Sequence, residues 1–128
     1  MKVAFVFPGQ GSQSIGMGQA LAEAFTSARE TFEEVDDAIK QNLFRQMVEG
    51  PEEFLTLTEN TQPALMSVSM AVIRVLEVEG KIDLSKKVSF VAGHSLGEYS
   101  ALTSAKSLRL ADTARLLKMR GQAMQDAV

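Results

Sequence analysis

The sequence is short of the residues that support metal and redox chemistry. It has no cysteine, no tryptophan, one histidine and one tyrosine among 128 residues. Without cysteine, disulfides, thiolate catalysis and cysteine-ligated metal sites are excluded. A single histidine leaves too few nitrogen ligands for a zinc site. We therefore expect no metal and no resident cofactor.

A strong net charge and long apolar runs are also missing. The net charge of −3 gives no general attraction for nucleic acid or anionic membranes. The longest apolar-rich stretch, residues 63–78, contains Arg74 and Glu77 and falls short of a membrane span. The apolar run at residues 3–7 is too short for the core of a signal peptide. These features predict a cytoplasmic protein that binds neither membranes nor nucleic acid.

Short apolar runs alternate with helical patterns along the chain. Residues 3–7 and 88–92 are continuous and apolar, which is typical of strands buried on both faces. Helices are expected over residues 17–25, 27–39, 43–48, 52–57, 63–79, 96–105 and 110–125. Ser27 and Glu30 have the spacing of a capping box, and Pro63 suits the first turn of its helix.

This order of elements predicts an α/β fold with parallel strands in a single segment, residues 1–128. Two strands alone do not form a sheet that can cover its own faces and edges. Either further strands come from another segment, or the fold is mostly helical.

The stretch "VSFVAGHSLGEYSA", residues 88–101, contains the pattern Gly-x-Ser-x-Gly. In a nucleophile elbow, a serine stands on a tight strand-to-helix turn, and the crowded positions two before and two after it favour small residues. Here both positions are glycine, with a strand before them and a helix after them. The context predicts Ser95 as the nucleophile, against the alternative of a structural turn.

An oxyanion formed on Ser95 would need two backbone donors. The elbow places the N–H of Leu96 at a helix N-terminus, where it would point at the oxyanion. The loop "PGQGSQ", residues 8–13, follows the first strand and offers the N–H of Gln10 as the second donor. The glycines of this segment lack the G-x-G-x-x-G spacing of a dinucleotide fingerprint. Gly11 and Gly16 have the glycine spacing of a Walker A motif, but Met17 stands where that motif needs lysine.

His94 adjoins Ser95 but does not suit the role of general base. Adjacent side chains on such a turn point in different directions, and the base of a triad lies far away in sequence. We expect His94 to be a structural, hydrogen-bonded residue. Because no histidine follows Ser95, this chain alone cannot carry out Ser–His chemistry.

Arg120 lies on an apolar face of the last predicted helix, with Leu117 and Met124 expected to point inward and Gly121 alongside. Spacing alone favours a structural role, in which Arg120 pairs with a carboxylate such as Glu98 or extends to the surface. The alternative is bidentate binding of a substrate carboxylate. Gly121 lowers helix propensity, which suggests that another group approaches closely there.

Four motifs together carry a family resemblance: "FVFPGQGSQ" (5–13), "TQPAL" (61–65), "GHSLGEYSAL" (93–102) and "MRG" (119–121). In this order and spacing they resemble the malonyl-CoA:acyl carrier protein transacylases of bacterial type II fatty acid synthesis. The resemblance implies that malonyl-CoA acylates Ser95, which passes the malonyl group to the pantetheine thiol of acyl carrier protein. It also implies oxyanion donors at Gln10 and Leu96, and a carboxylate-binding role for Arg120.

Members of this family are considerably longer than this chain. Their base histidine, remaining strands and ferredoxin-like subdomain lie beyond the residues matched here. The resemblance therefore implies that this chain is the N-terminal part of an α/β-hydrolase-like subdomain and is mostly helical. It also implies that the chain lacks the general base and is inactive alone. The intact enzyme is expected to be monomeric. A serine esterase or lipase, and a non-enzymatic fragment that self-associates through sheet edges, remain as alternatives.

Overall fold

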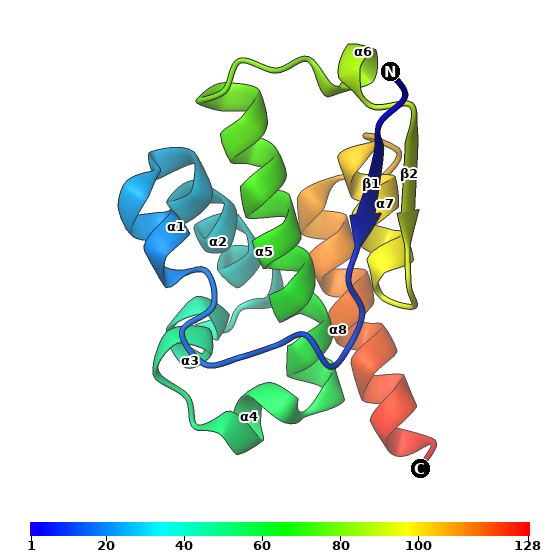
Figure 1. Ribbon diagram of the computed structural model, residues 1–128. Helices are drawn as coiled ribbons and strands as arrows, with labels where there is room; N and C mark the ends of the chain where they lie inside the picture. Colours follow the sequence, from blue (N-terminus) through cyan, green and yellow to red (C-terminus); the bar gives the residue numbers. More distant parts are fainter.

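The computed structural model describes residues 1–128 and is mostly helical, with one small parallel sheet (Figure 1). The elements in chain order are β1 (Ala4–Phe7), α1 (Gln19–Ala24), α2 (Thr26–Ile39), α3 (Leu43–Glu49), α4 (Glu52–Thr56), α5 (Thr58–Val78), α6 (Leu84–Lys87), β2 (Phe90–Gly93), α7 (Gly97–Ser104) and α8 (Leu110–Asp126). The predicted α/β class with parallel strands is confirmed, as are both strands and the seven predicted helices, with shifted ends.

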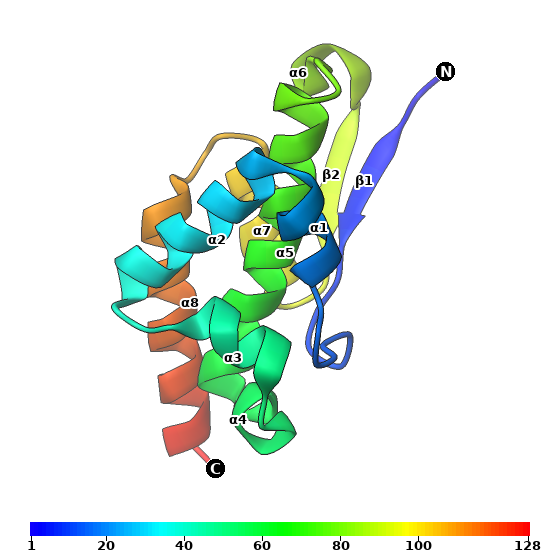
Figure 2. The same cartoon turned by 90° about the vertical axis from the view of Figure 1, so that its left-hand side faces the viewer.

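A helical layer forms most of the core. The long central helix α5 contacts both α2 and α8, and α2 also contacts α8, so that apolar stripes from three helices meet. Figure 2 shows this layer beside the sheet, with α7 packed against both strands. The largest fully buried apolar side chains are Phe32, Val35, Leu43, Met47, Leu55, Met66, Leu96 and Leu117. Burial of each such side chain stabilises the fold by roughly 1.5–3 kcal/mol.

The sheet brings the two candidate loops to the same edge. β1 and β2 pair in parallel, with Ala4 opposite Phe90 and Phe7 opposite Gly93. Because parallel strands end at the same edge, the loop after β1 and the turn after β2 lie side by side (Figure 1). This pairing joins segments more than 80 residues apart at the carboxyl edge of the sheet.

The predicted burial of both strands on two faces is wrong. In β1, Phe5 and Phe7 are sheltered, whereas the alternating residue Val6 is 75% exposed. In β2, Phe90 is 61% exposed. Side chains alternate between the faces of a strand, and helices cover only one face of this sheet.

The starts of two helices differ from the sequence prediction. α2 begins at Thr26 with Phe25 as its cap, and no capping box forms. The Ser27 hydroxyl therefore lies inside the helix, buried and without a hydrogen-bond partner. α5 begins at Thr58, so Pro63 lies inside the helix and not in its first turn. Pro63 is buried, and packing of α5 in the core compensates for the backbone hydrogen bond that proline removes.

A short helix, α6, was not predicted. It covers one turn, and the carboxylate of Asp83 caps it by accepting a hydrogen bond from the N–H of Ser85 at 3.1 Å. One turn carries too little hydrophobic periodicity to stand out in a sequence. It lies between α5 and β2, where the chain turns back towards the sheet (Figure 1).

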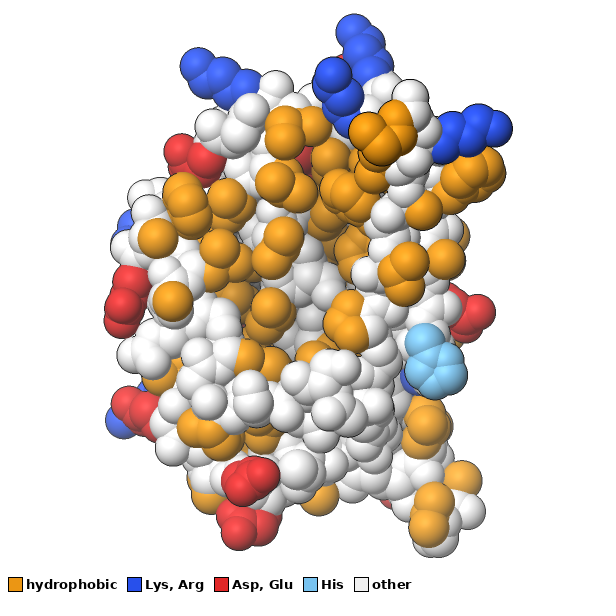
Figure 3. Space-filling view, viewed as in Figure 1, with side chains coloured by type: hydrophobic (Ala, Val, Ile, Leu, Met, Phe, Trp, Pro, Cys, Tyr) orange, Lys and Arg blue, Asp and Glu red, His pale blue; other side chains and the backbone are white.

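An apolar groove runs between β1 and α5. Its volume is about 360 Å³, and Figure 3 shows apolar side chains gathered over this part of the surface. The lining residues are Ala4, Phe5, Val6, Phe7, Pro8, Val68, Ser69, Val72, Ile73 and Leu76. Val72 of α5 is 43% exposed in this groove. None of the helices combines the length and apolar character that crossing a bilayer requires.

Asp36 of α2 makes the stability of the chain depend on pH. Burial raises the pKa of the Asp36 carboxyl from 3.8 to about 6, although the backbone N–H groups of Phe44 and Leu43 lower it. A carboxyl whose pKa is higher in the native state than in the unfolded state stabilises the fold at pH values below the unfolded-state pKa. This contribution to stability is lost as the pH rises through the native-state pKa of about 6. Asp36→Asn removes the cost of the buried charge while keeping an oxygen acceptor for Phe44.

We expect Asp36→Asn to be more stable than the wild type at about pH 7.5, by about 1 kcal/mol after solvent screening is considered. The advantage should shrink at about pH 4.5, where the wild-type carboxyl is largely protonated in the native state. Urea unfolding of both proteins at the two pH values measures this difference. An advantage of equal size at both would contradict the assignment.

Candidate active site

Ser95 stands on a strained turn between β2 and α7. Its backbone has a φ of 57°, in the left-handed region that non-glycine residues seldom occupy. Such strain persists only where the surrounding structure imposes it, and it is concentrated at functional sites. The turn therefore has the local geometry of a nucleophile elbow, as the Gly-x-Ser-x-Gly pattern predicts.

The two glycines of the pattern are required by close packing of the main chain. A Cβ on Gly93 would overlap the carbonyl group of Gly97 and the nitrogen of Glu98. A Cβ on Gly97 would overlap the carbonyl oxygen of Phe7, at the end of β1. The steric reason given for the pattern is thus confirmed, and Gly97 also joins the elbow to the first strand.

The loop after β1 packs directly against the elbow. A Cβ on Gly9 would lie 2.7 Å from the carbonyl oxygen of His94, so glycine permits this approach. The side chain of Gln10 reaches Thr58 at the start of α5, with its Nε2 3.4 Å from the Thr58 hydroxyl. The backbone N–H groups of Gln10 and Leu96 donate no hydrogen bond within the chain. Their proposed role as oxyanion donors remains a prediction.

His94 contributes to the elbow through its backbone and not through its ring. Its N–H donates to the carbonyl of Phe7 at 3.3 Å, and its carbonyl accepts from Gly97 at 3.0 Å. The expectation of a hydrogen-bonded side chain is wrong, because the residue is exposed and its imidazole makes no hydrogen bond. The only side chain that hydrogen-bonds the Ser95 hydroxyl is that of Arg120.

Arg120 reaches the elbow from α8 and is half-buried. Its Nη2 donates to the Ser95 hydroxyl at 3.2 Å, and its Nη1 donates to Oε1 of Gln62 at 2.7 Å. The guanidinium carbon lies 5.4 Å from the centre of the Tyr99 ring. The internal ion pair considered for Arg120, with Glu98 or another carboxylate, does not form. The cation therefore faces the candidate nucleophile without an anionic partner.

Gly121 allows α8 to approach the first turn of α5. A Cβ on Gly121 would overlap Cα of Glu59 and lie 2.8 Å from the carbonyl oxygen of Thr58. This is the close approach that the sequence predicted, and the approaching group is the backbone of α5. Met124, predicted to point inward, is 42% exposed, although its sulfur accepts a hydrogen bond from Nε2 of Gln62 at 3.1 Å.

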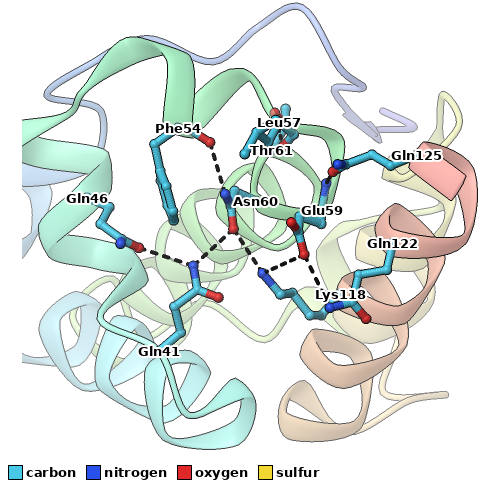
Figure 4. A network of polar contacts seen from close by, with 10 residues as sticks. All are labelled: Gln41, Gln46, Phe54, Leu57, Glu59, Asn60, Thr61, Lys118, Gln122 and Gln125. Carbon is cyan, nitrogen blue, oxygen red and sulfur yellow. Dashed lines mark hydrogen bonds and ion pairs between the residues drawn. The ribbon is translucent and has the colours of Figure 1, made fainter.

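A polar network fixes α8 against α5 beside this contact (Figure 4). Nζ of Lys118 lies 2.9 Å from Oδ1 of Asn60 and 3.3 Å from Oε2 of Glu59. Oδ1 of Asn60 also accepts from Gln41, and Gln122 donates to Glu59. These bonds connect α8 to the start of α5, and through Gln41 to the segment after α2. They restrict sliding of α8, which carries Arg120.

Two residues at the site were not identified from the sequence, namely Gln62 and Tyr99. Gln62 is 1% exposed and belongs to a buried polar cluster, Asn60–Gln62, at the start of an apolar helix. Because buried polar side chains need hydrogen-bond partners, the polar residues at the start of this apolar helix were the signal that could have identified Gln62. Tyr99 is the only tyrosine and lies one turn after Ser95, but its position in the sequence does not indicate a contact with Arg120.

Comparison with known proteins finds extensive similarity. The acyl transferase domain family matches residues 4–128. The malonyl CoA-acyl carrier protein transacylase of Salmonella typhimurium is 47% identical over 125 residues, covering 98% of this chain and 39% of that protein. The crystal structure of an acyl-carrier-protein-S-malonyltransferase from Bartonella henselae superimposes with a TM-score of 0.97 at 62% identity, covering 100% of this chain and 40% of that one.

A second similar structure was solved with a carrier protein bound. It is a malonyl-transacylase in complex with a type II PKS acyl-carrier protein, with a TM-score of 0.92 and 44% identity over 100% of this chain and 40% of that one. The chain thus spans about 40% of the length of the relatives it matches.

Proposed function

Because this chain belongs to the acyl transferase domain family, we propose that it is the N-terminal part of a serine acyltransferase that moves malonyl groups. The complete enzyme would take malonyl from malonyl-CoA, hold it as an ester on Ser95 and transfer it to acyl carrier protein. The observation that carries this proposal is the direct contact between an unpaired guanidinium and the elbow serine. The proposed reaction needs no metal or resident cofactor and takes place in the cytoplasm.

The contact between Arg120 and Ser95 suits a short acyl group that ends in a carboxylate. In malonyl, a single carbon separates the carboxylate from the thioester carbonyl. The 3.2 Å between Nη2 and the Ser95 hydroxyl means that both groups can engage one such acyl chain. Arginine binds a carboxylate through two parallel hydrogen bonds, which fixes the orientation of the carbonyl as well as its position.

The chemistry would proceed in two balanced steps. Oγ of Ser95 attacks the thioester carbonyl, a C–O bond forms, the C–S bond breaks, and the hydroxyl proton ends on the thiol of coenzyme A. The pantetheine thiol of acyl carrier protein then attacks the ester, and Oγ leaves and regains a proton. In each step the oxyanion would be bound by the N–H groups of Gln10 and Leu96. The general base would come from outside residues 1–128, since the only side chain that hydrogen-bonds the Ser95 hydroxyl is the guanidinium of Arg120, which donates hydrogen bonds and accepts none.

Intact-mass measurement of the complete enzyme after incubation with malonyl-CoA tests this proposal. We expect an added mass of one malonyl group, located at Ser95 by peptide mapping and lost when acyl carrier protein is added. Rapid release of free malonate, with no transfer to acyl carrier protein, would instead support the esterase alternative. Absence of any adduct or transfer in the complete enzyme would refute the proposal.

Arg120→Ala tests the carboxylate-binding role. Loss of a charged pair in a partly desolvated site costs about 3 kcal/mol, so kcat/KM for malonyl-CoA should fall roughly 100-fold. Acetyl-CoA lacks the carboxylate, and its low reactivity should change little. Arg115→Ala, on the exposed side of the same helix, is the matched control and should leave both rates unchanged. If Arg120→Ala discriminates between malonyl-CoA and acetyl-CoA as well as the wild type does, Arg120 does not bind the substrate carboxylate.

A further inference from the structure

Arg120 differs from every other arginine in the chain. The other five each lie within 3.9 Å of a carboxylate, in the pairs Arg29–Glu33, Arg45–Glu49, Arg74–Glu34, Arg109–Asp112 and Arg115–Asp112. Arg120, although more sheltered than most of them, contacts only uncharged groups. A half-buried cation without an anion is costly, so the structure must provide other stabilisation.

Gln62 provides the first part of this stabilisation. Its side chain is almost fully buried, and its two ends have different partners. Nε2 donates to the sulfur of Met124 at 3.1 Å, which leaves Oε1 to accept from Nη1 of Arg120 at 2.7 Å. The amide therefore holds one nitrogen of the guanidinium with a strong hydrogen bond but adds no negative charge.

Tyr99 provides the second part. Its ring faces the guanidinium, with the Arg120 carbon 5.4 Å from the ring centre. An aromatic face attracts a cation through its quadrupole, again without a formal charge. Tyr99 lies on α7 and Gln62 on α5, so two helices fix the guanidinium from different directions.

We propose that Gln62 and Tyr99 form a neutral cradle that orients Arg120 towards Ser95 while leaving its charge uncompensated. Position 62 would then be specificity-determining, because selectivity for carboxylated acyl groups requires an uncharged acceptor there. The inference rests on the proposed function, since it explains how Arg120 stays available for a substrate carboxylate. Gln62 and Tyr99 are positioning residues in this arrangement and need not contact the acyl group.

Gln62→Glu is the decisive variant, because it changes charge with almost no change in shape. The introduced carboxylate would pair with Nη1 of Arg120 and repel the carboxylate of malonyl. In the complete enzyme, we expect kcat/KM for malonyl-CoA to fall about 100-fold, mainly through KM, with little change for acetyl-CoA. Gln62→Met, of similar length but uncharged, should lose about 10-fold or less. An equal loss for both acyl groups, or equal losses in both variants, would overturn the proposal.

A pair of variants at Tyr99 provides an independent test should Gln62→Glu fail to fold. Tyr99→Phe keeps the aromatic face and should retain malonyl selectivity within about twofold, whereas Tyr99→Leu should lose about fivefold to tenfold for malonyl-CoA alone. Equal selectivity for malonyl-CoA in the Tyr99→Phe and Tyr99→Leu variants would show that the ring does not help to orient Arg120. If Arg120→Ala lowers malonyl selectivity but Gln62→Glu and Tyr99→Leu do not, the cradle is wrong and the proposed function stands. If the wild-type enzyme transfers no malonyl, the proposed function itself has failed.

Discussion

Ser95→Ala is expected to abolish the malonyl adduct of the complete enzyme. Without Oγ there is no atom to carry the acyl group, so transfer to acyl carrier protein should fall by at least about 10⁴-fold. The hydroxyl is not needed for folding, because its one side-chain contact is with Arg120. Intact-mass measurement and the rate of malonyl transfer, made on the same preparation, check both parts of this result.

Ser100→Ala is the matched control for this variant. Ser100 lies five residues further on, in α7, and its buried hydroxyl has no hydrogen-bond partner. Removing an unpaired buried hydroxyl should leave stability unchanged or slightly higher. The malonyl adduct should therefore form at its normal rate. A persistent adduct in Ser95→Ala, mapped to another residue, would refute the assignment of the nucleophile.

Gly93→Ala is expected to have the largest effect on folding. The new methyl group would overlap the main chain of Gly97 and Glu98, and no flexible side chain can move aside. Relief of the clash requires β2 and α7 to separate at the elbow, which we expect to cost about 3 kcal/mol. Urea unfolding of the 128-residue chain measures this loss without any need for catalysis.

Gly11→Ala separates this steric effect from the general cost of replacing a glycine. Gly11, unlike Gly93, has a positive φ, of 113°, and nothing lies within 4 Å of a Cβ built there. The backbone strain alone should cost about 1–2 kcal/mol. If Gly93→Ala destabilised the chain no more than Gly11→Ala, close packing would not be the reason for glycine at position 93.

The sequence predicted well those features that depend on neighbouring residues. The elbow around Ser95 was recognisable because strand, turn and helix follow one another directly, and their steric demands fall on Gly93 and Gly97. Helix ends were less accurate, as at Ser27 and Pro63. A cap depends on a few weak contacts, whereas packing of the whole helix in the core decides where it begins.

The tertiary structure alone decided which groups Arg120 contacts. Spacing placed it on a helix face beside a glycine but left a structural ion pair and a substrate site both open. Its partners lie 58 residues away at Gln62 and 25 residues away at Ser95, so only the packing of α8 against α5 brings them together. Sequence therefore determined the elbow and the position of its serine, because an elbow is local. The fold decided what faces it, because contacts between helices depend on how distant segments pack.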